Sequence, residues 1–228
     1  MLPATYGERS GKQMSNESIL RRYQELLNAK KLTKGQKQTL LAATELFATQ
    51  GYDATSTAQI AKLAQVSEAT IFKYYSSKEK LLLAIIEPIT SELVPSLQAE
   101  FFTKVLSENS ASLSELITFI VYDRFEFIKD NYQVIRIFVQ ESLTKPEIRQ
   151  LVSANFKQAL ADNQASFKPV LELVGKKYPD YDETVIIRAL VGPLLAYFLQ
   201  RFIMAPDVAY NEKRDLDLIV RQIKSVLA

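Results

Sequence analysis

The sequence predicts an all-α protein, on its composition and on the spacing of its apolar residues. The chain has 228 residues, of which 47% are apolar, enough for a substantial core, and it contains only 6 glycines and 8 prolines. So few turn-forming residues leave little room for the many short strands of a β protein. Apolar residues instead recur at three- and four-residue intervals, which is the period of amphipathic helices.

Cysteine and histidine are both absent from the sequence. The chain can therefore form no disulfide, no thiolate metal site and no Ser–His or Cys–His catalytic pair. We expect a protein without catalytic residues, metal or cofactor. An enzyme on this chain would be a carboxylate-based helical enzyme, and it would have to draw on residues such as Glu141, Glu147, Glu172 or Asp182.

The first residues contain no continuous apolar region of signal-peptide length. The longest uncharged apolar stretch, 189–199, is too short to span a bilayer. We therefore expect a cytoplasmic protein with no membrane partner.

Residues 1–32 are predicted to be a leader, irregular up to about residue 16 and then forming a short amphipathic helix. Apolar residues recur there at helical spacing. They are Ile19, Leu20, Tyr23, Leu26 and Leu27.

Three helices are predicted within residues 33–80. The first begins at Thr33, which can form a capping box with Gln36, carries Leu40, Thr44 and Phe47 on one face, and ends at a glycine, residue 51. The second is predicted to begin with Thr57 as its cap and to bury Ile60, Ala61 and Leu63. After a tight link at 65–66, Ser67 caps a third helix that reaches Tyr74, and two short helices joined in this way match a helix-turn-helix.

Residues 81–228 are predicted to form a larger helical domain. A fourth helix begins at Ser76, with Glu79 completing a capping box, and Pro88 and Pro95 should bend or interrupt it. Capping signals and breaks then divide the rest into helices, with one capping box expected at Ser112 and Glu115 and another at Asp180 and Glu183. These helices cover 112–130, 131–143, 146 to about 177, 182–204 and 211–227.

Positive charge is concentrated near the N-terminus. Residues 30–80 hold eight lysines and four acidic residues, a net charge of +4, whereas the remainder holds 20 basic and 22 acidic residues. Such an asymmetry favours an anionic partner at one end of the protein, although a solvated lysine-rich face would give the same count.

The segment 57–81, TAQIAKLAQVSEATIFKYYSSKEKL, resembles the tetracycline-repressor (TetR) family of transcriptional regulators. The resemblance rests on a threonine opening the second helix, alanines in the core, Val-Ser in the turn, and the aromatic and Lys-Glu positions that follow. It implies an N-terminal helix-turn-helix that binds DNA and a larger C-terminal domain that binds an effector. It also implies a homodimer formed through the last two helices, about 182–204 and 211–227.

The third helix of the helix-turn-helix would insert its N-terminal end into the major groove of double-stranded operator DNA. Lys73 can meet guanine or phosphate, the methyl-bearing Ala69 and Thr70 can touch thymine, and Glu68 can accept from cytosine unless it is solvated or paired with lysine. Phe72 stands where the family often has tyrosine, so we expect core packing, with a thymine or sugar contact as the alternative. The resemblance also implies phosphate contacts by Thr57, Tyr74 and Lys78. The full predicted DNA-binding set is Thr57, Ser67, Glu68, Ala69, Thr70, Phe72, Lys73, Tyr74 and Lys78.

Polar groups on apolar helix faces are candidates for an effector site. Arg124, Arg136 and Gln140 stand on such faces, and Tyr122 and Tyr197 could form walls around a largely apolar, anionic small molecule. The alternative for each arginine is an ion pair, for example with Glu141, or a side chain extended to solvent.

The function predicted is therefore that of a ligand-responsive repressor, released from a palindromic operator by a small molecule. A helical protein-interaction module and a carboxylate-based helical enzyme are the alternatives. The leader helix leaves two possibilities open, packing on the body or an added DNA contact through Arg21, Arg22, Lys30 and Lys31.

Overall fold

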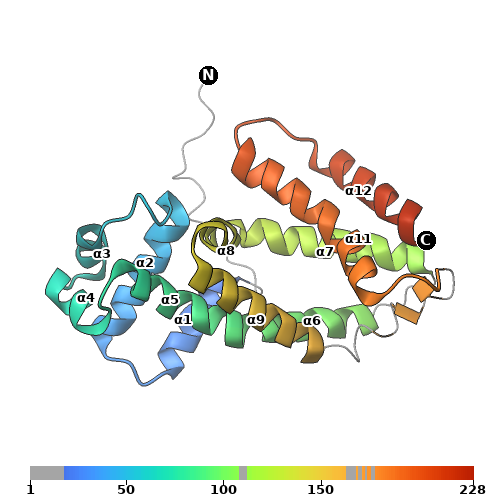
Figure 1. Cartoon of the computed structure of the whole chain (residues 1–228). Helices are drawn as coiled ribbons and strands as arrows, with labels where there is room; N and C mark the ends of the chain where they lie inside the picture. Colours follow the sequence, from blue (N-terminus) through green and yellow to red (C-terminus); the bar gives the residue numbers. More distant parts are fainter. Residues whose placement is uncertain (1–17, 108–111, 163–167, 169–170, 173, 176–177) are drawn as a thin grey trace.

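A computed structural model of the chain describes residues 18–107, 112–162, 168, 171–172, 174–175 and 178–228, and every regular element within them is a helix (Figure 1). This confirms the predicted all-α class. The elements are α1 (Ile19–Ala29), α2 (Lys34–Gln50), α3 (Thr57–Ala64), α4 (Glu68–Tyr74), α5 (Lys78–Pro88), η2 (Ile89–Leu93), α6 (Val94–Ser107), α7 (Leu113–Asp130), α8 (Tyr132–Thr144), α9 (Pro146–Asp162), α11 (Glu183–Phe198), η3 (Leu199–Met204) and α12 (Glu212–Leu227).

The helices α2, α3 and α4 form one end of the molecule, and α11 and α12 lie side by side at the other (Figure 1). The continuous run of α5, η2 and α6 connects the two ends, while α8 lies between them. The helix expected from residue 146 to about 177 is seen as α9, and much of its predicted C-terminal part lies outside the described residues.

Local capping signals explain where most helices begin. Thr33 forms the expected capping box with Gln36, and Ser67 and Ser112 accept the expected hydrogen bonds from backbone amides three residues on. Three expected caps were wrong by one or two residues. The residues with extended backbone that accept the capping hydrogen bond are Ser56 in place of Thr57, Ser77 in place of Ser76, and Asp182 in place of Asp180.

Pro88 ends α5, as expected of a residue that lacks an amide donor. The backbone then continues as the π-helical turn η2, in which the amide of Val94 bonds to the carbonyl of Ile89. Pro95 does not interrupt α6, because it lies in the first turn of that helix, where proline is tolerated.

Buried apolar side chains form two main clusters. The first joins α1 to α5 and η2 and also takes in Val134 and Ile137 of α8, and the second joins α7, α11 and α12. The first cluster therefore crosses residue 80, the boundary expected between the two domains, so the helix-turn-helix and the following helices share one core. The division into 33–80 and 81–228 stays a prediction.

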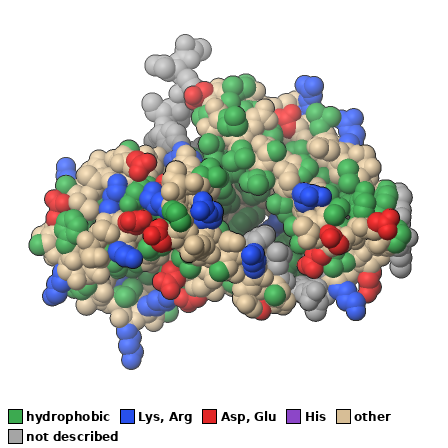
Figure 2. All heavy atoms as spheres, viewed as in Figure 1, with side chains coloured by type: hydrophobic (Ala, Val, Ile, Leu, Met, Phe, Trp, Pro, Cys, Tyr) green, Lys and Arg blue, Asp and Glu red, His purple; other side chains and the backbone are tan. Residues whose placement is uncertain are grey.

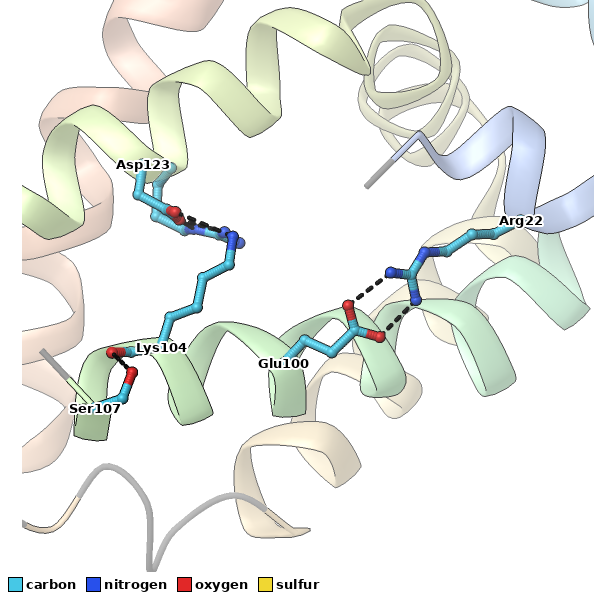
Figure 3. A network of polar contacts seen from close by, with 6 residues as sticks. Arg22, Glu100, Lys104, Ser107 and Asp123 are labelled. Carbon is cyan, nitrogen blue, oxygen red and sulfur yellow. Dashed lines mark hydrogen bonds and ion pairs between the residues drawn. The ribbon is translucent and has the colours of Figure 1, made fainter. Parts of the chain in front are cut away.

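The leader helix α1 packs on the body of the protein. Its Ile19, Tyr23 and Leu27 side chains are buried, and the amide of Ile19 donates a 2.7 Å hydrogen bond to Oδ1 of Asn131. Two cations of this segment are held by acidic residues of the neighbouring helices. Arg22 makes two 2.6 Å hydrogen bonds to Glu100 (Figure 3), and Lys30 lies 2.6 Å from Glu92.

Two helical segments are long and apolar enough to cross a membrane by length and composition alone, 78–107 and 183–204. Both segments are longer than the uncharged apolar stretch 189–199 because they include charged residues. Buried residues make up 44% of the apolar window of the first and 28% of that of the second. Core helices of soluble proteins pass the same test, so this is weak evidence for a membrane span.

Candidate nucleic-acid interface

The turn between α3 and α4 sets the geometry of the candidate interface. Gln65 adopts a left-handed conformation, with φ of 55°, which ends α3, and the amide of Val66 bonds back to the carbonyl of Ala61. Ser67 then starts α4 by accepting a 3.1 Å hydrogen bond from the amide of Thr70. The chain thereby changes direction between the two helices, and most residues of α4 lie exposed on the surface.

Small and β-branched residues pack the inner sides of α3 and α4. The buried ones are Ile60, Ala61, Ala64 and Ile71, none more than 6% exposed. Leu63 was expected inside but is 44% exposed, because positions 60, 61 and 64 already form the inward face of this two-turn helix.

The outer face of α4 carries most of the predicted DNA-binding residues. Ser67, Glu68, Ala69 and Lys73 are exposed, and Thr70 is half-buried beside them. Figure 2 shows Lys and Arg side chains spread over this end of the molecule, with acidic side chains among them.

Phe72 lies on this outer face as well. Its side chain is 46% exposed, so the expectation that it packs in the core was wrong. Ile71, at 1% exposure, takes the inward position, and the next residue of a helix is turned about 100° away from it. An aromatic ring is thus available to a ligand bound along α4.

Hydrogen bonds within the protein hold several of these side chains in place. Thr57 Oγ1 donates a 2.7 Å hydrogen bond to Glu68 Oε2, so Glu68 is held by a hydroxyl and not by a lysine. Thr33 Oγ1 donates a 3.2 Å bond to the hydroxyl of Tyr74, and Lys73 Nζ lies 5.9 Å from the centroid of the Tyr74 ring. No local pattern in the sequence indicates that Thr33 contacts Tyr74, which is 41 residues away.

Lys78 has an inward-directed ammonium group. Its Nζ donates 2.9 Å hydrogen bonds to the carbonyls of Tyr52 and Thr55 and lies 4.2 Å from the centroid of the Tyr52 ring. Lys78 therefore holds the turn between α2 and α3. A lysine has three N–H donors, so one remains for the phosphate contact that the family resemblance implies.

The five residues expected at the effector site lie in three separate places. The guanidinium of Arg124 pairs with its neighbour Asp123 and lies 3.9 Å from the centroid of the Phe101 ring, facing α6. Lys104 approaches Asp123 to 3.4 Å at the same place (Figure 3). Arg124 thus pairs with Asp123, whereas Glu141 pairs with Lys145.

The other four candidates face different neighbours. Tyr122 and Tyr197 donate hydrogen bonds of 2.7 and 3.1 Å to Asp217 and Asp215 of α12, respectively. Arg136 and Gln140 lie on α8, along a groove of about 570 Å³ between that helix and the turn after α2. No group of side chains suited to holding a metal ion occurs within the described ranges.

The fold, the tight turn and the exposed helix α4 define a helix-turn-helix DNA-binding protein. Residues 40–85 match the family model for bacterial regulatory proteins of the tetR family. The helix-turn-helix region of the chain thus resembles that of this family. It is 30% identical over 112 residues to the transcriptional activator FasR of Mycolicibacterium smegmatis, and this match covers 49% of the chain and about half, 48%, of that relative.

Longer matches extend over most of the chain. It is 26% identical to the nucleoid occlusion factor SlmA of Pasteurella multocida over 178 residues, which are 74% of the chain and 83% of SlmA. A TetR-family regulator from Mesorhizobium loti has the same fold, with a TM-score of 0.60 and 17% identity over 84% of the chain and 96% of its own. FadR of Bacillus subtilis, solved with stearoyl-CoA, has a TM-score of 0.54 and 16% identity, and the match covers 84% of this chain and 97% of FadR.

Proposed function

We propose that this chain is a homodimeric repressor that binds a palindromic operator through α3 and α4 and is released by a small molecule. The observation that carries the proposal is the exposed face of α4, where hydrogen-bond donors, methyl groups and a lysine stand on a helix seated by a tight turn. A recognition helix of this kind reads base edges in the major groove.

Base recognition and phosphate binding are divided among the nine predicted residues. Ala69, Thr70 and Phe72 offer apolar surface to thymine methyl groups, and Glu68 can accept a hydrogen bond from cytosine. Lys73 offers a cation to guanine or to phosphate. The hydroxyl of Tyr74 is proposed to bind phosphate, a contact that would orient the protein without reading sequence. Lys78 serves the same end through the N–H donor that its two hydrogen bonds within the protein leave over, whereas Thr57 would have to release Glu68 to donate its hydroxyl proton to a phosphate.

Dimerisation is proposed through α11 and α12. Val191 and Leu195, one turn apart on α11, are 48% and 44% exposed, and Leu218 and Val226 of α12 are 44% and 39% exposed. Large apolar side chains gathered on two adjacent helices favour a partner protein surface. Two-fold symmetry would place the two recognition helices about 34 Å apart, matching successive turns of the major groove.

The effector is proposed to be a largely apolar anion. Lys104 and Arg124 both approach the carboxylate of Asp123 between α6 and α7, where Arg124 also lies 3.9 Å from the centroid of the Phe101 ring, so cations stand beside an apolar surface there. Figure 2 shows a hollow lined by hydrophobic side chains near the middle of the face in view. The relative solved with stearoyl-CoA supports a ligand of this type for the fold. Arg124→Ala should weaken effector binding, and unchanged binding would exclude this site.

Selection of bound sequences from a random DNA duplex library tests the proposal. The purified chain should enrich a palindrome with two half-sites one helical turn apart. Enrichment of a single asymmetric site, or of none, would contradict the dimeric repressor.

A further inference from the structure

We propose that Tyr52 and Arg136 are positioning residues that lock the helix-turn-helix at one orientation relative to α8. They act without touching DNA. The contacts that they make are called the latch below, and its members are Tyr52, Lys78, Arg136 and Lys145. The consequence for DNA binding rests on the proposed function, whereas the lock itself does not.

Tyr52 is the centre of the latch. It lies in the turn after α2, is 9% exposed, and packs its ring 5.2 Å from that of Phe47. Two ammonium groups approach this one ring, Lys78 Nζ at 4.2 Å and Lys145 Nζ at 4.3 Å from its centroid. Lys78 begins α5 and Lys145 follows α8, so one aromatic ring joins three parts of the chain through cation–π contacts.

Lys145 is itself held in place. Its ammonium pairs with the carboxylate of Glu141, one turn earlier on α8, and Glu141 is only 6% exposed. The ammonium of Lys145 is therefore held against the end of α8 by a buried carboxylate. Tyr52 consequently rests against a cation whose position is set by the body of the protein.

Arg136 makes the second contact of the latch. Its Nη2 donates a 3.0 Å hydrogen bond to the carbonyl of Ala48, in the last turn of α2. Carbonyls in this turn lack intrahelical partners and form the negative end of the helix dipole, yet α2 has no basic residue in its last turn. Arg136 supplies that missing charge from α8.

The latch borders the groove of about 570 Å³ that separates the turn after α2 from the outer side of α8. Apolar packing of Val134 and Ile137 also joins α8 to the helix-turn-helix core, but such packing is non-directional. Hydrogen bonds and cation–π contacts depend on angle and distance. The latch is therefore the part of this joint that specifies an orientation.

The absence of cysteine allows a direct test with spin labels. Labels at Lys62→Cys on α3 and Ser153→Cys on α9, both exposed positions, report the orientation through their distance distribution, measured by double electron–electron resonance. Dilution with unlabelled chain suppresses distances between protomers. Arg136→Met with Lys145→Met should broaden the distribution, whereas the matched control Arg149→Met with Lys157→Met, at exposed sites of α9, should not.

Single substitutions keep the proposal testable if the double variant Arg136→Met with Lys145→Met does not fold. Lys145→Met alone removes one cation, and Tyr52→Phe keeps the ring, so the first should broaden the distribution and the second should leave it narrow. Circular dichroism establishes that each variant is helical. A folded double variant with the parental distribution would overturn the proposal.

A second readout connects the latch with DNA. On the selected palindrome, the parent should lose affinity when the half-site spacing changes by one base pair, and the double variant should lose several-fold less. Affinity for a single half-site should be equal in both. If the distance distribution broadens in the double variant but no palindrome is selected, the proposed function is refuted and the latch is supported. If a palindrome is selected but the distribution does not broaden, the latch is refuted and the proposed function is supported.

Discussion

Thr57 Oγ1 donates a 2.7 Å hydrogen bond to Oε2 of Glu68, and this bond joins the first turn of α3 to the first turn of α4. One carboxylate oxygen is thus occupied and the carboxylate has a fixed direction. Its other oxygen can still accept a hydrogen bond. We therefore propose that Glu68 reads cytosine from the start of α4.

Replacing Glu68 by alanine should remove the preference for one base in each half-site. A specific base contact of this kind discriminates by about 1–3 kcal/mol, while overall affinity for DNA should rise because a negative charge near the phosphates is lost. Sequence selection and affinity measurements with the variant test the base preference and the overall affinity. Thr57→Val is the control, because it keeps the Glu68 carboxylate and removes the hydrogen bond that holds it. An operator profile identical to that of the parent would show that Glu68 reads no base.

Replacing Lys73 by methionine should flatten the salt dependence of DNA binding. Each phosphate contact that is lost lowers the slope of log affinity against log salt by about 1. Lys157, an exposed lysine of α9, provides the matched control, and its methionine variant should keep the parental slope. Parallel lines for Lys73→Met and the parent would mean that Lys73 neutralises no phosphate.

Stability at alkaline pH should depend on Tyr52. Burial, and next the negative charge of Glu79, raise the pKa of Tyr52 to about 12, above the value near 10 of an unfolded chain. Between about pH 10 and 12 the unfolded chain releases this proton and the folded chain keeps it. The free energy of unfolding therefore falls as pH rises, by at most about 1.4 kcal/mol per pH unit from this group.

Urea unfolding of the parent and of Tyr52→Phe measures this dependence. The difference in unfolding free energy between the two should be constant below about pH 10 and should shift in favour of the variant above it. A difference that stays constant up to pH 12 would contradict the raised pKa.

Leu195→Glu should yield a monomer with weakened operator binding. A carboxylate at the centre of an apolar interface would be buried without a partner, which is costly. Leu143→Glu is the control, since Leu143 is 75% exposed on α8, away from α11 and α12. Sedimentation velocity distinguishes the species. A Leu195→Glu dimer would exclude α11 as the interface.

The sequence predicts the helices well where their ends depend on neighbouring residues. The caps at Thr33, Ser67 and Ser112 are of this kind, because each bonds to an amide three residues away. Leu63 and Phe72 were misassigned because, in helices of eight and seven residues, a small error in rotation moves a side chain from the core to the surface.

The effector candidates show a different limit. Periodicity correctly marked Arg124 and Arg136 as polar residues beside apolar ones, but it gives no information on the partner. Arg124 meets the ring of Phe101, and Arg136 meets the carbonyl of Ala48, 88 residues away. Contacts over such separations depend on how the helices pack, which local patterns do not encode.

The affinity of the purified chain for its selected DNA, measured across a salt series, tests the central claim most directly. A dimeric DNA reader should bind the selected palindrome as two protomers, far more tightly than a scrambled duplex, with an affinity that falls steeply as salt rises. Equal binding to both duplexes, or binding that is insensitive to salt, would contradict the account.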